Sequence, residues 1–466
     1  MNHPVTRPRR AGVRLAALAL PLALLGACAG GSSEPAASST PSASAEATAT
    51  KTEAAAVTPR LVLTYDGGLV VLDATTLETV DTIEADGFLR VNPAGDGRHV
   101  MVSTEGGFQV LDAGTWAQPH GDHDHYWTSD PVLTDTVFEA DEPGHAVVHG
   151  DTLALFADGT GEVTVVDPAA VAEGEDAVVR EYRAPSAHHG VAVVRTDDTM
   201  VVSDGTEDER TGVRLLGADD TEIAATDQCP GVHGEAVAAN DVVTVGCQDG
   251  IVIVSGQSVT KVQAPDAYGR IGNQAGHEDS PYVLGDYKTD KDAELERPTR
   301  VTITDTAAGT LRVVDLPSSY TFRSLARGDA GEALVLGTDG QIHVIDPATA
   351  TLTRSIPVID AWEEPMEWQE PRPAIHVLDG TAYVTDPSTD RVLAVDVETG
   401  EVWNEVTLDV TPNEITSAPG RAPHAHGDEH AGETAEEHAE HAGETAEEHA
   451  EHDHEHDHEH EHGTEG

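Results

Sequence analysis

Short segments in which apolar and polar residues alternate recur from residue 59 to about residue 411. Gly68–Asp73, Gly107–Asp112 and Gly340–Asp346 are examples, and each ends at an acidic residue. Alternation with a period of two indicates β-strands, and the glycine and aspartate turns between them indicate antiparallel neighbours. The sequence shows no amphipathic helical pattern of useful length, so it predicts an all-β fold.

The strands group into units of about 40–50 residues with four strands each, which is typical of a β-propeller blade. Such units begin near residues 60, 88, 143, 187, 231, 273, 322 and 373. We therefore expect a single propeller of eight blades, with seven as the alternative. The first unit has only three strands, and Asn413–Thr416 is a spare strand at the other end. We expect this spare to be the innermost strand of the first blade, because a closed ring leaves no sheet edge exposed.

The two ends of the chain do not share this pattern. Residues 1–27 combine four arginines with an apolar run, Leu15–Leu25, that is too short to span a bilayer, which is typical of a signal peptide. The run Leu-Gly-Ala-Cys28 resembles a bacterial lipobox, so we expect a lipidated Cys28, with an ordinary secreted protein as the alternative. Residues 28–58 are rich in Ala, Ser, Thr, Glu and Pro and predict a disordered tether. The propeller is expected over 59–418, and a disordered tail over 419–466.

The charge and the cysteines narrow the class of protein. The chain has 84 acidic and 26 basic residues, a formal charge of −58, which excludes a nucleic-acid binder. Such acidity suits a protein that meets cations, although a general acidic bias in composition explains part of it. Cys229 and Cys247 remain after Cys28 and predict a disulfide in an oxidising compartment. A two-cysteine metal site is the alternative, but it usually has closer spacing.

Histidines inside the predicted ring have a regular spacing. His145, His189, His233 and His277 follow one another at intervals of 44 residues, close to the length of one blade. They are therefore expected just before the innermost strand of four consecutive blades, facing the central channel. Three or four imidazoles fill a tetrahedral zinc site, whereas calcium and magnesium prefer oxygen ligands. Further candidate ligands beside them are His188 and Glu235. The alternative is that each histidine hydrogen-bonds a neighbouring blade and holds the ring together.

A second group, His120, His123 and His125, lies in the long connection between the second and third blades. The interleaved aspartates and short spacings favour metal capture by a mobile loop that reaches the same mouth of the ring. A solvated acidic loop is the alternative.

The tail contains 12 histidines in alternation with acidic residues, which predicts many weak, exchanging metal sites. Copper(II) and nickel bind such a chain as well, so the tail indicates transition metals in general. The alternative is a merely solvated run of charge. The candidate ligands are His424, His426, His430, His438, His441, His449, His452, His454, His456, His458, His460 and His462.

G-x-S-x-G does not occur in the sequence, and H-E-x-x-H occurs only within the alternating histidine and acid run of the tail, at 454–458 and 458–462. We therefore expect that the protein is not an enzyme. A propeller hydrolase that uses a metal-bound water is the less favoured alternative.

Five motifs together resemble the AztD-type zinc metallochaperones, over about residues 60–411 and most clearly over 118–260. They are HGDHDHYW at 120–127, DEPGHAVVHGDTLALFADGTG at 141–161, AHHGVAV at 187–193, CPGVHGEA at 229–236 and GCQDG at 246–250. The resemblance implies an exported β-propeller that binds zinc and transfers it to the solute-binding protein of a zinc ABC importer. It also implies that the histidines of HGDHDH, AHHG and CPGVHGEA bind the metal and that Cys229 and Cys247 pair.

The lipobox and the histidine-rich tail are additional to this pattern. We therefore expect a monomeric zinc chaperone, lipid-anchored on the extracytoplasmic face of the cell membrane. The main alternative is a lipid-anchored propeller scaffold whose tail buffers transition metals.

Overall fold

The computed structural model describes residues 50–121 and 123–421. The predicted signal peptide, Cys28, most of the predicted tether and the twelve tail histidines lie outside the described residues. Within the described part, no helix is long and apolar enough to cross a membrane.

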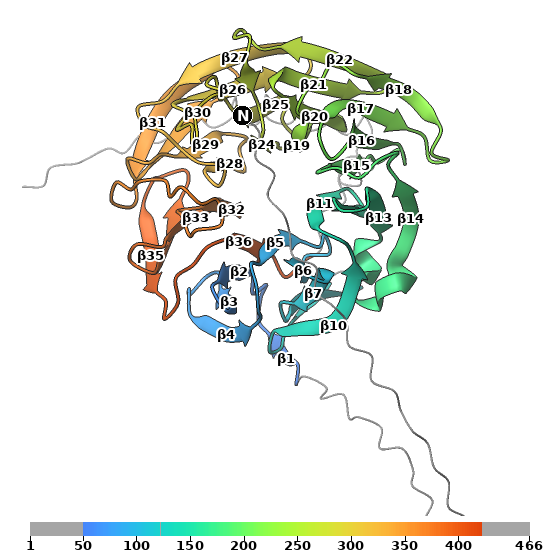
Figure 1. The fold of residues 1–466 in the computed structure, drawn as a ribbon. Coiled ribbons are helices and arrows are strands. Elements are labelled where there is room, and N and C mark those ends of the chain that lie inside the picture. Colours follow the sequence, from blue (N-terminus) through green and yellow to red (C-terminus); the bar gives the residue numbers. More distant parts are fainter. Residues whose placement is uncertain (1–49, 122, 422–466) are drawn as a thin grey trace, which may run out of the picture. The chain divides into compact units, whose positions relative to one another are not determined.

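Eight four-stranded antiparallel blades follow one another around a ring (Figure 1). From the innermost strand outward, the first four blades are β36 (Ile415–Ala418), β2 (Arg60–Tyr65), β3 (Gly68–Asp73) and β4 (Thr79–Glu84); β5 (Arg90–Pro93), β6 (His99–Thr104), β7 (Gly107–Asp112) and β10 (Val132–Glu139); β11 (Pro143–His149), β12 (Thr152–Ala157), β13 (Glu162–Val166) and β14 (Val178–Arg183); and β15 (Ala192–Val194), β16 (Met200–Gly205), β17 (Arg210–Leu216) and β18 (Glu222–Thr226).

The other four blades are β19 (His233–Ala238), β20 (Val242–Cys247), β21 (Asp249–Ser255) and β22 (Ser258–Gln263); β24 (Gln274–Ala275), β25 (Tyr282–Asp286), β26 (Arg300–Asp305) and β27 (Thr310–Asp315); β28 (Leu325–Arg327), β29 (Ala333–Leu336), β30 (Gln341–Asp346) and β31 (Thr351–Pro357); and β32 (Ile375–Leu378), β33 (Thr381–Asp386), β34 (Arg391–Asp396) and β35 (Val402–Thr407). A short strand, β23 (Gly269–Arg270), pairs with β21, and the 3₁₀ helix η1 (Pro168–Ala177) joins β13 to β14. The expected all-β propeller is confirmed, with eight blades rather than seven.

Every pair of neighbouring blades shares a cluster of buried apolar side chains, and this includes the eighth and first blades. Successive side chains of one strand pack against the two different neighbouring blades. With the blades numbered in the order given above, Leu61 and Leu63 pack toward blade 8 (β32–β35), whereas Val62 packs toward blade 2 (β5, β6, β7 and β10). Both faces of such a strand are buried, which is why the central strands read as nearly continuous apolar runs.

The ring closes as the sequence predicts, because β36 from the end of the propeller pairs with β2 from its beginning. His376 of β32 lies at this seam, with its Nε2 atom 2.8 Å from the hydroxyl of Ser417 in β36. Burial lowers the pKa of His376 from 6.5 to about 4. The folded protein therefore keeps this ring neutral at a pH where the unfolded chain protonates it.

We expect the seam to be acid-sensitive for this reason. Since the folded pKa is lower than the unfolded one, the stabilisation is complete above pH 6.5 and is lost progressively as the pH falls toward about 4. Between pH 7 and pH 5, urea unfolding should show the wild type losing about 1–2 kcal/mol more than His376→Asn. Equal losses in the two proteins would show that His376 does not carry the effect.

The two ends of the ring are distinguished by their connections. Because each blade is an antiparallel meander, the outer strand of one blade joins the inner strand of the next at the same end every time. We call this end, with connections such as 85–89, 184–191 and 358–374, the inter-blade face. The opposite end is called the hairpin face, because the hairpin β8 (Thr115–His120) and β9 (His123–Thr128) is inserted there between β7 and β10.

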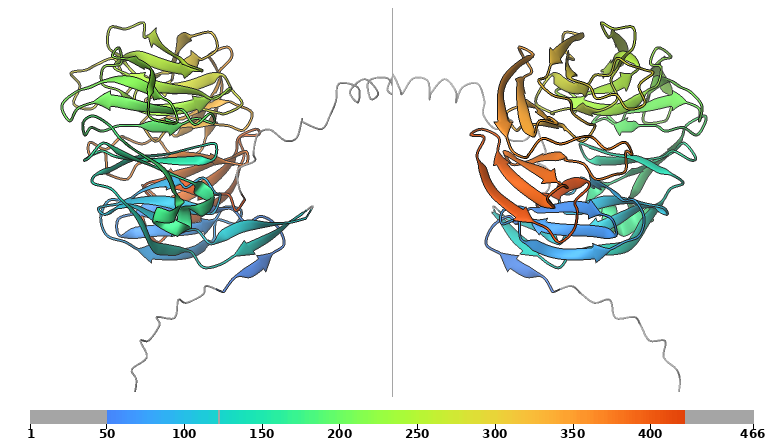
Figure 2. Two further views of the ribbon diagram at one scale, coloured as in Figure 1. Left: turned by 90° about the vertical axis from the view of Figure 1, so that its right-hand side faces the viewer. Right: turned by 60° about the vertical axis from the view of Figure 1, so that its left-hand side comes forward.

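The hairpin extends away from the ring, and β1 (Thr52–Ala54) pairs with β9 to make a three-stranded sheet (Figure 2). Residues 52–54 fall within the tether expected over 28–58, but the structure makes them a strand. The physical reason is that β9 would otherwise offer an open edge. Lys51 adds a contact, with its ammonium 4.1 Å from the centre of the Trp127 ring.

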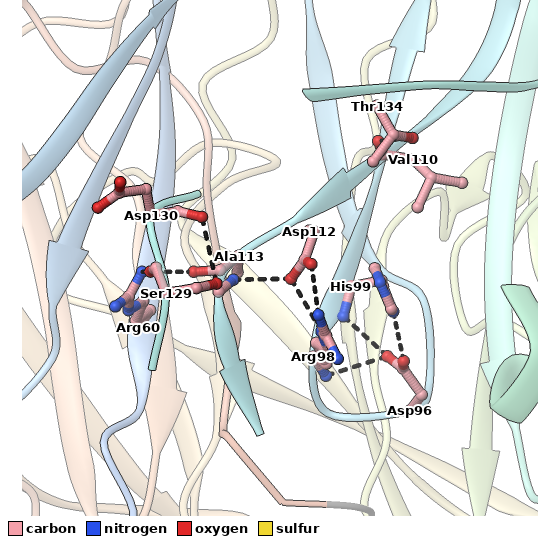
Figure 3. A network of polar contacts seen from close by, with 11 residues as sticks. Arg60, Asp96, Arg98, His99, Val110, Asp112, Ala113, Ser129, Asp130 and Thr134 are labelled. Atoms are coloured by element: carbon pink, nitrogen blue, oxygen red, sulfur yellow. Dashed lines mark hydrogen bonds and ion pairs between the residues drawn. The ribbon is translucent and has the colours of Figure 1, made fainter. Parts of the chain in front are cut away.

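The base of the hairpin is fixed to the ring (Figure 3). One guanidinium nitrogen of Arg60 donates to the main-chain oxygens of Ala113 and Ser129, at 2.7 and 3.0 Å, where the chain leaves and re-enters the blade. Arg98 forms two hydrogen bonds with Asp112 and also lies over the ring of Trp116. The hairpin is therefore an arm with a rigid attachment.

Candidate metal centre

His145, His189 and His233 come together on the inter-blade face, from three consecutive blades. One ligand atom of each lies within 4.8 Å of those of the other two. The ring centres are 5.0–5.8 Å apart. His145 is in β11, His189 is in the connection before β15, and His233 begins β19. Radial repetition thus gathers side chains that are 44 residues apart in sequence.

A different oxygen orients each of the three rings. The Nδ1 atom of His145 is 3.1 Å from Glu235, and that of His189 is 2.5 Å from Asp158. The Nδ1 atom of His233 donates to the main-chain oxygen of Gly272 at 2.6 Å. A neutral imidazole that donates from Nδ1 keeps its Nε2 lone pair for a metal, and such partners fix the tautomer and the direction of the ring.

Two of the three histidines, His145 and His233, differ in charge preference. Burial lowers the pKa of His233 well below its usual value, and the nearby His145 lowers it further. Burial also lowers the pKa of His145, but the charge and hydrogen bond of Glu235 outweigh it, so the net pKa is raised. His233 is therefore neutral and ready to bind a metal at neutral pH, whereas at His145 a proton competes with the metal.

Three imidazole ligands suit zinc and leave the fourth tetrahedral position open. Glu235 lies beside His145 as an orienting group, and the cluster of converging ligand atoms comprises the three histidines. The arrangement can bind one ion while still accepting a ligand from elsewhere.

We expect the orienting carboxylate of His189 to tune this site. Asp158→Asn should weaken zinc binding by about 10- to 100-fold, the usual cost of losing such a partner. The measurement is a competition titration with a chromophoric chelator, and the exposed Asp151→Asn, at the other end of β12, is the matched control. Identical affinities for the two variants would contradict an orienting role for Asp158.

The second cluster, His120, His123 and His125, is formed by the tip of the hairpin. Its ligand atoms also lie within 4.8 Å of one another, and the ring centres are 5.1–5.3 Å apart. The Nδ1 atom of His125 lies 2.8 Å from Glu53 of β1. The expectation that this group reaches the same mouth as the ring histidines is wrong, because it lies on the hairpin face, at the opposite end of the ring.

Two predicted ligands are not brought to the three-histidine cluster. The ring of His188 is buried between the third and fourth blades, against Phe156 of β12, with hydrogen bonds to the main-chain oxygen of Ser186 and to the hydroxyl of Ser203 in β16. The other three histidines lie near the start of their inner strands. His277 instead comes after its inner strand, because β24 has only two residues and ends before it. It bridges to Ala238, at the far end of β19, and is thus carried toward the hairpin face.

Sequence reasoning missed Asp158, the Gly272 carbonyl and Glu53. Asp158 belongs to an Asp-Gly pair, which in the sequence indicates only an ordinary turn. The Gly272 oxygen belongs to the main chain, so no side chain in the sequence indicates its role. Both are supplied by neighbouring blades, and only the packing of one blade against the next places them beside an imidazole.

The predicted disulfide between Cys229 and Cys247 is present. It joins the connection that leads to His233 with the end of β20, and both cysteines are fully buried. The cross-link therefore holds the segment 229–233 against its own blade.

Fold and clusters together define the class: an eight-bladed β-propeller with one three-histidine cluster on each face. The chain is 25% identical over 373 residues to the zinc chaperone AztD of Citrobacter koseri, covering 77% of this chain and 86% of AztD. The resemblance to AztD-type proteins inferred from the motifs is thereby confirmed. No protein-family model matches the chain.

Two solved structures of Citrobacter koseri AztD are similar to this fold. The first has a TM-score of 0.68 at 22% identity, over 78% of this chain and 98% of the other. The structure of the apo form has a TM-score of 0.66 with the same coverage and identity. A dihydro-heme d1 dehydrogenase, NirN, is more distant, with a TM-score of 0.50 at 10% identity over 77% of this chain and 74% of that one.

Proposed function

We propose that this protein is a zinc metallochaperone that holds zinc outside the cytoplasmic membrane and delivers it to the solute-binding protein of a zinc ABC importer. The observation that carries the proposal is the cluster of His145, His189 and His233, whose Nδ1 atoms are all engaged by oriented oxygens. The name of the relative, a zinc chaperone, supports the choice of metal and the absence of enzymatic activity.

The open fourth position gives this site a route for transfer. Zinc with three protein ligands can take a fourth from a partner and expand to five-coordinate before it leaves. Protonation of His145, whose pKa is raised, would weaken the hold on the ion by removing one of its three ligands. A site with four protein ligands would lack this entry point.

A transfer assay tests the proposed function. Zinc-loaded protein that ends at residue 418 is mixed with the metal-free solute-binding protein from the same cell, and zinc is measured in each after separation. Near-stoichiometric zinc on the truncated propeller, followed by movement to the recipient faster than spontaneous release, is expected. A truncated propeller that holds no zinc would favour the scaffold whose tail buffers metals.

We further propose that Cys28 carries a lipid that holds the protein at the extracytoplasmic membrane face. Cys28→Ala should move the protein from the membrane fraction to the soluble fraction, with an unchanged circular dichroism spectrum. Retention of this variant in the membrane fraction would refute the anchor.

A further inference from the structure

An exposed apolar patch lies on the inter-blade face, the same face as the three-histidine cluster. Met366 and Trp368 belong to the connection between β31 and β32 and are 52% and 53% exposed. Phe88, in the connection between β4 and β5, meets Trp368 edge to face with ring centres 5.0 Å apart. The patch therefore spans two connections that are far apart in sequence.

This patch differs from the other exposed apolar side chains of the described residues. Those lie singly or in pairs on the outer strands of their blades, as Val80 in β4 and Trp403 in β35 do. Scattered apolar residues on an outer rim are normal for any soluble protein. Met366 and Trp368 instead belong to a long connection at the end of the ring.

The connection that carries the patch is held rigidly. Arg372, at 2% exposure, donates to the carboxylate of Glu364 and to the main-chain oxygen of Glu367, and lies over the Phe322 ring. Asn413 donates to the main-chain oxygen of Gln369 at 3.0 Å. A buried ion pair is a costly way to shape a loop, and its result is a tryptophan fixed in an exposed position.

The patch and the metal cluster lie on the same face of the ring, and Arg90 is near both in the chain or in space. Arg90, two residues after Phe88, begins the innermost strand β5, and its charge acts on both His145 and Glu235. Arg90 also lines a cavity of about 200 Å³ together with Phe322, Arg323 and Glu414. Patch, cavity and cluster thus all lie on the inter-blade face.

The same two connections carry exposed acidic residues beside the apolar patch in sequence, namely Asp86, Glu363, Glu367 and Glu370. Rigid aromatic anchors with a polar rim are typical of protein-binding hot spots. We infer that Phe88, Met366 and Trp368 form the docking site for the protein that receives the metal, and that this partner presents an apolar pocket bordered by lysine or arginine. The inference rests on the proposed function and adds the surface that brings the recipient to the cluster.

The test compares two exposed tryptophans in the zinc-transfer assay with the solute-binding protein of the same cell. Trp368→Ala should lower the second-order transfer rate by about 30-fold, the effect of removing a hot-spot residue. Trp403→Ala, on the outer strand β35, should transfer at the wild-type rate. Both variants should keep the wild-type zinc affinity, since neither residue belongs to the cluster.

A charge test complements it. The double reversal Glu367→Lys and Glu370→Lys should slow transfer at low salt, and the difference should shrink at high salt, because the rim steers the encounter electrostatically.

Equal transfer rates for Trp368→Ala and Trp403→Ala would overturn the docking site while leaving the proposed function intact. If the wild type itself transfers no zinc, the proposed function fails and the docking site with it. A wild-type dimer in sedimentation that Trp368→Ala dissociates would instead assign the patch to a second copy of this chain.

Discussion

Replacing His189 and His233 together with alanine should weaken the tightest zinc binding by about 10,000-fold or more. Four-ligand structural zinc sites bind with about 10–16 kcal/mol, so each ligand contributes about 2.5–4 kcal/mol, or 10²- to 10³-fold. Both side chains are partly exposed and lie near the ends of strands, so the ring should keep its β-rich circular dichroism spectrum. Competition titration against a zinc chelator measures the affinity.

Two controls separate the ring from the tail. Deleting residues 419–466 should lower the number of zinc ions bound but leave the tightest site. His277→Ala, at the same 44-residue interval but outside the cluster, should change neither. The interpretation fails if the tail deletion removes the tightest zinc and the double substitution leaves it unchanged, because the ring would then be a scaffold.

Removing the disulfide with Cys229→Ala and Cys247→Ala should lower the free energy of unfolding by about 3 kcal/mol. The bond closes a loop with a sequence separation of 18, and the chain-entropy estimate for a loop of this length gives about that value. Because the cross-link holds the segment before His233, zinc affinity should fall as well. Denaturant unfolding of the zinc-free protein isolates the first effect.

The Cys28→Ala variant is the control for the loss of a cysteine, since it leaves the bond intact. An unfolding free energy that is unchanged by the double substitution, in non-reducing buffer, would show that the bond contributes nothing to the stability of the ring.

The blades could be predicted from the sequence because each one repeats the same local pattern, in which strands of alternating apolar and polar residues are separated by turns. The predicted start near residue 143 agrees with β11, and the spare strand after residue 413 does close the first blade. Regular spacing also identified His145, His189 and His233, since equal positions in consecutive blades meet around one axis.

The same spacing misassigned His277, because the inner strand of blade 6 is only two residues long and the histidine falls on its other side. The location of the hairpin cluster depends on the direction of β7, which periodicity does not encode. The orienting oxygens of Asp158 and Gly272 come from tertiary packing, so local sequence patterns do not reveal them. Long-range geometry is thus the part of the site that sequence alone left undetermined.

The placement of both described chain ends on the hairpin face gives the molecule a polarity. β1 pairs with the hairpin, and β36 ends beside Arg60 at the base of that hairpin. If Cys28 is anchored, residues 29–51 allow at most about 80 Å of reach even when fully extended. The tether would then leave the ring on the side of the hairpin histidines, opposite the face that carries the three-histidine cluster. A recipient held at the same membrane would therefore reach the three-histidine cluster only in orientations that turn the inter-blade face toward the membrane.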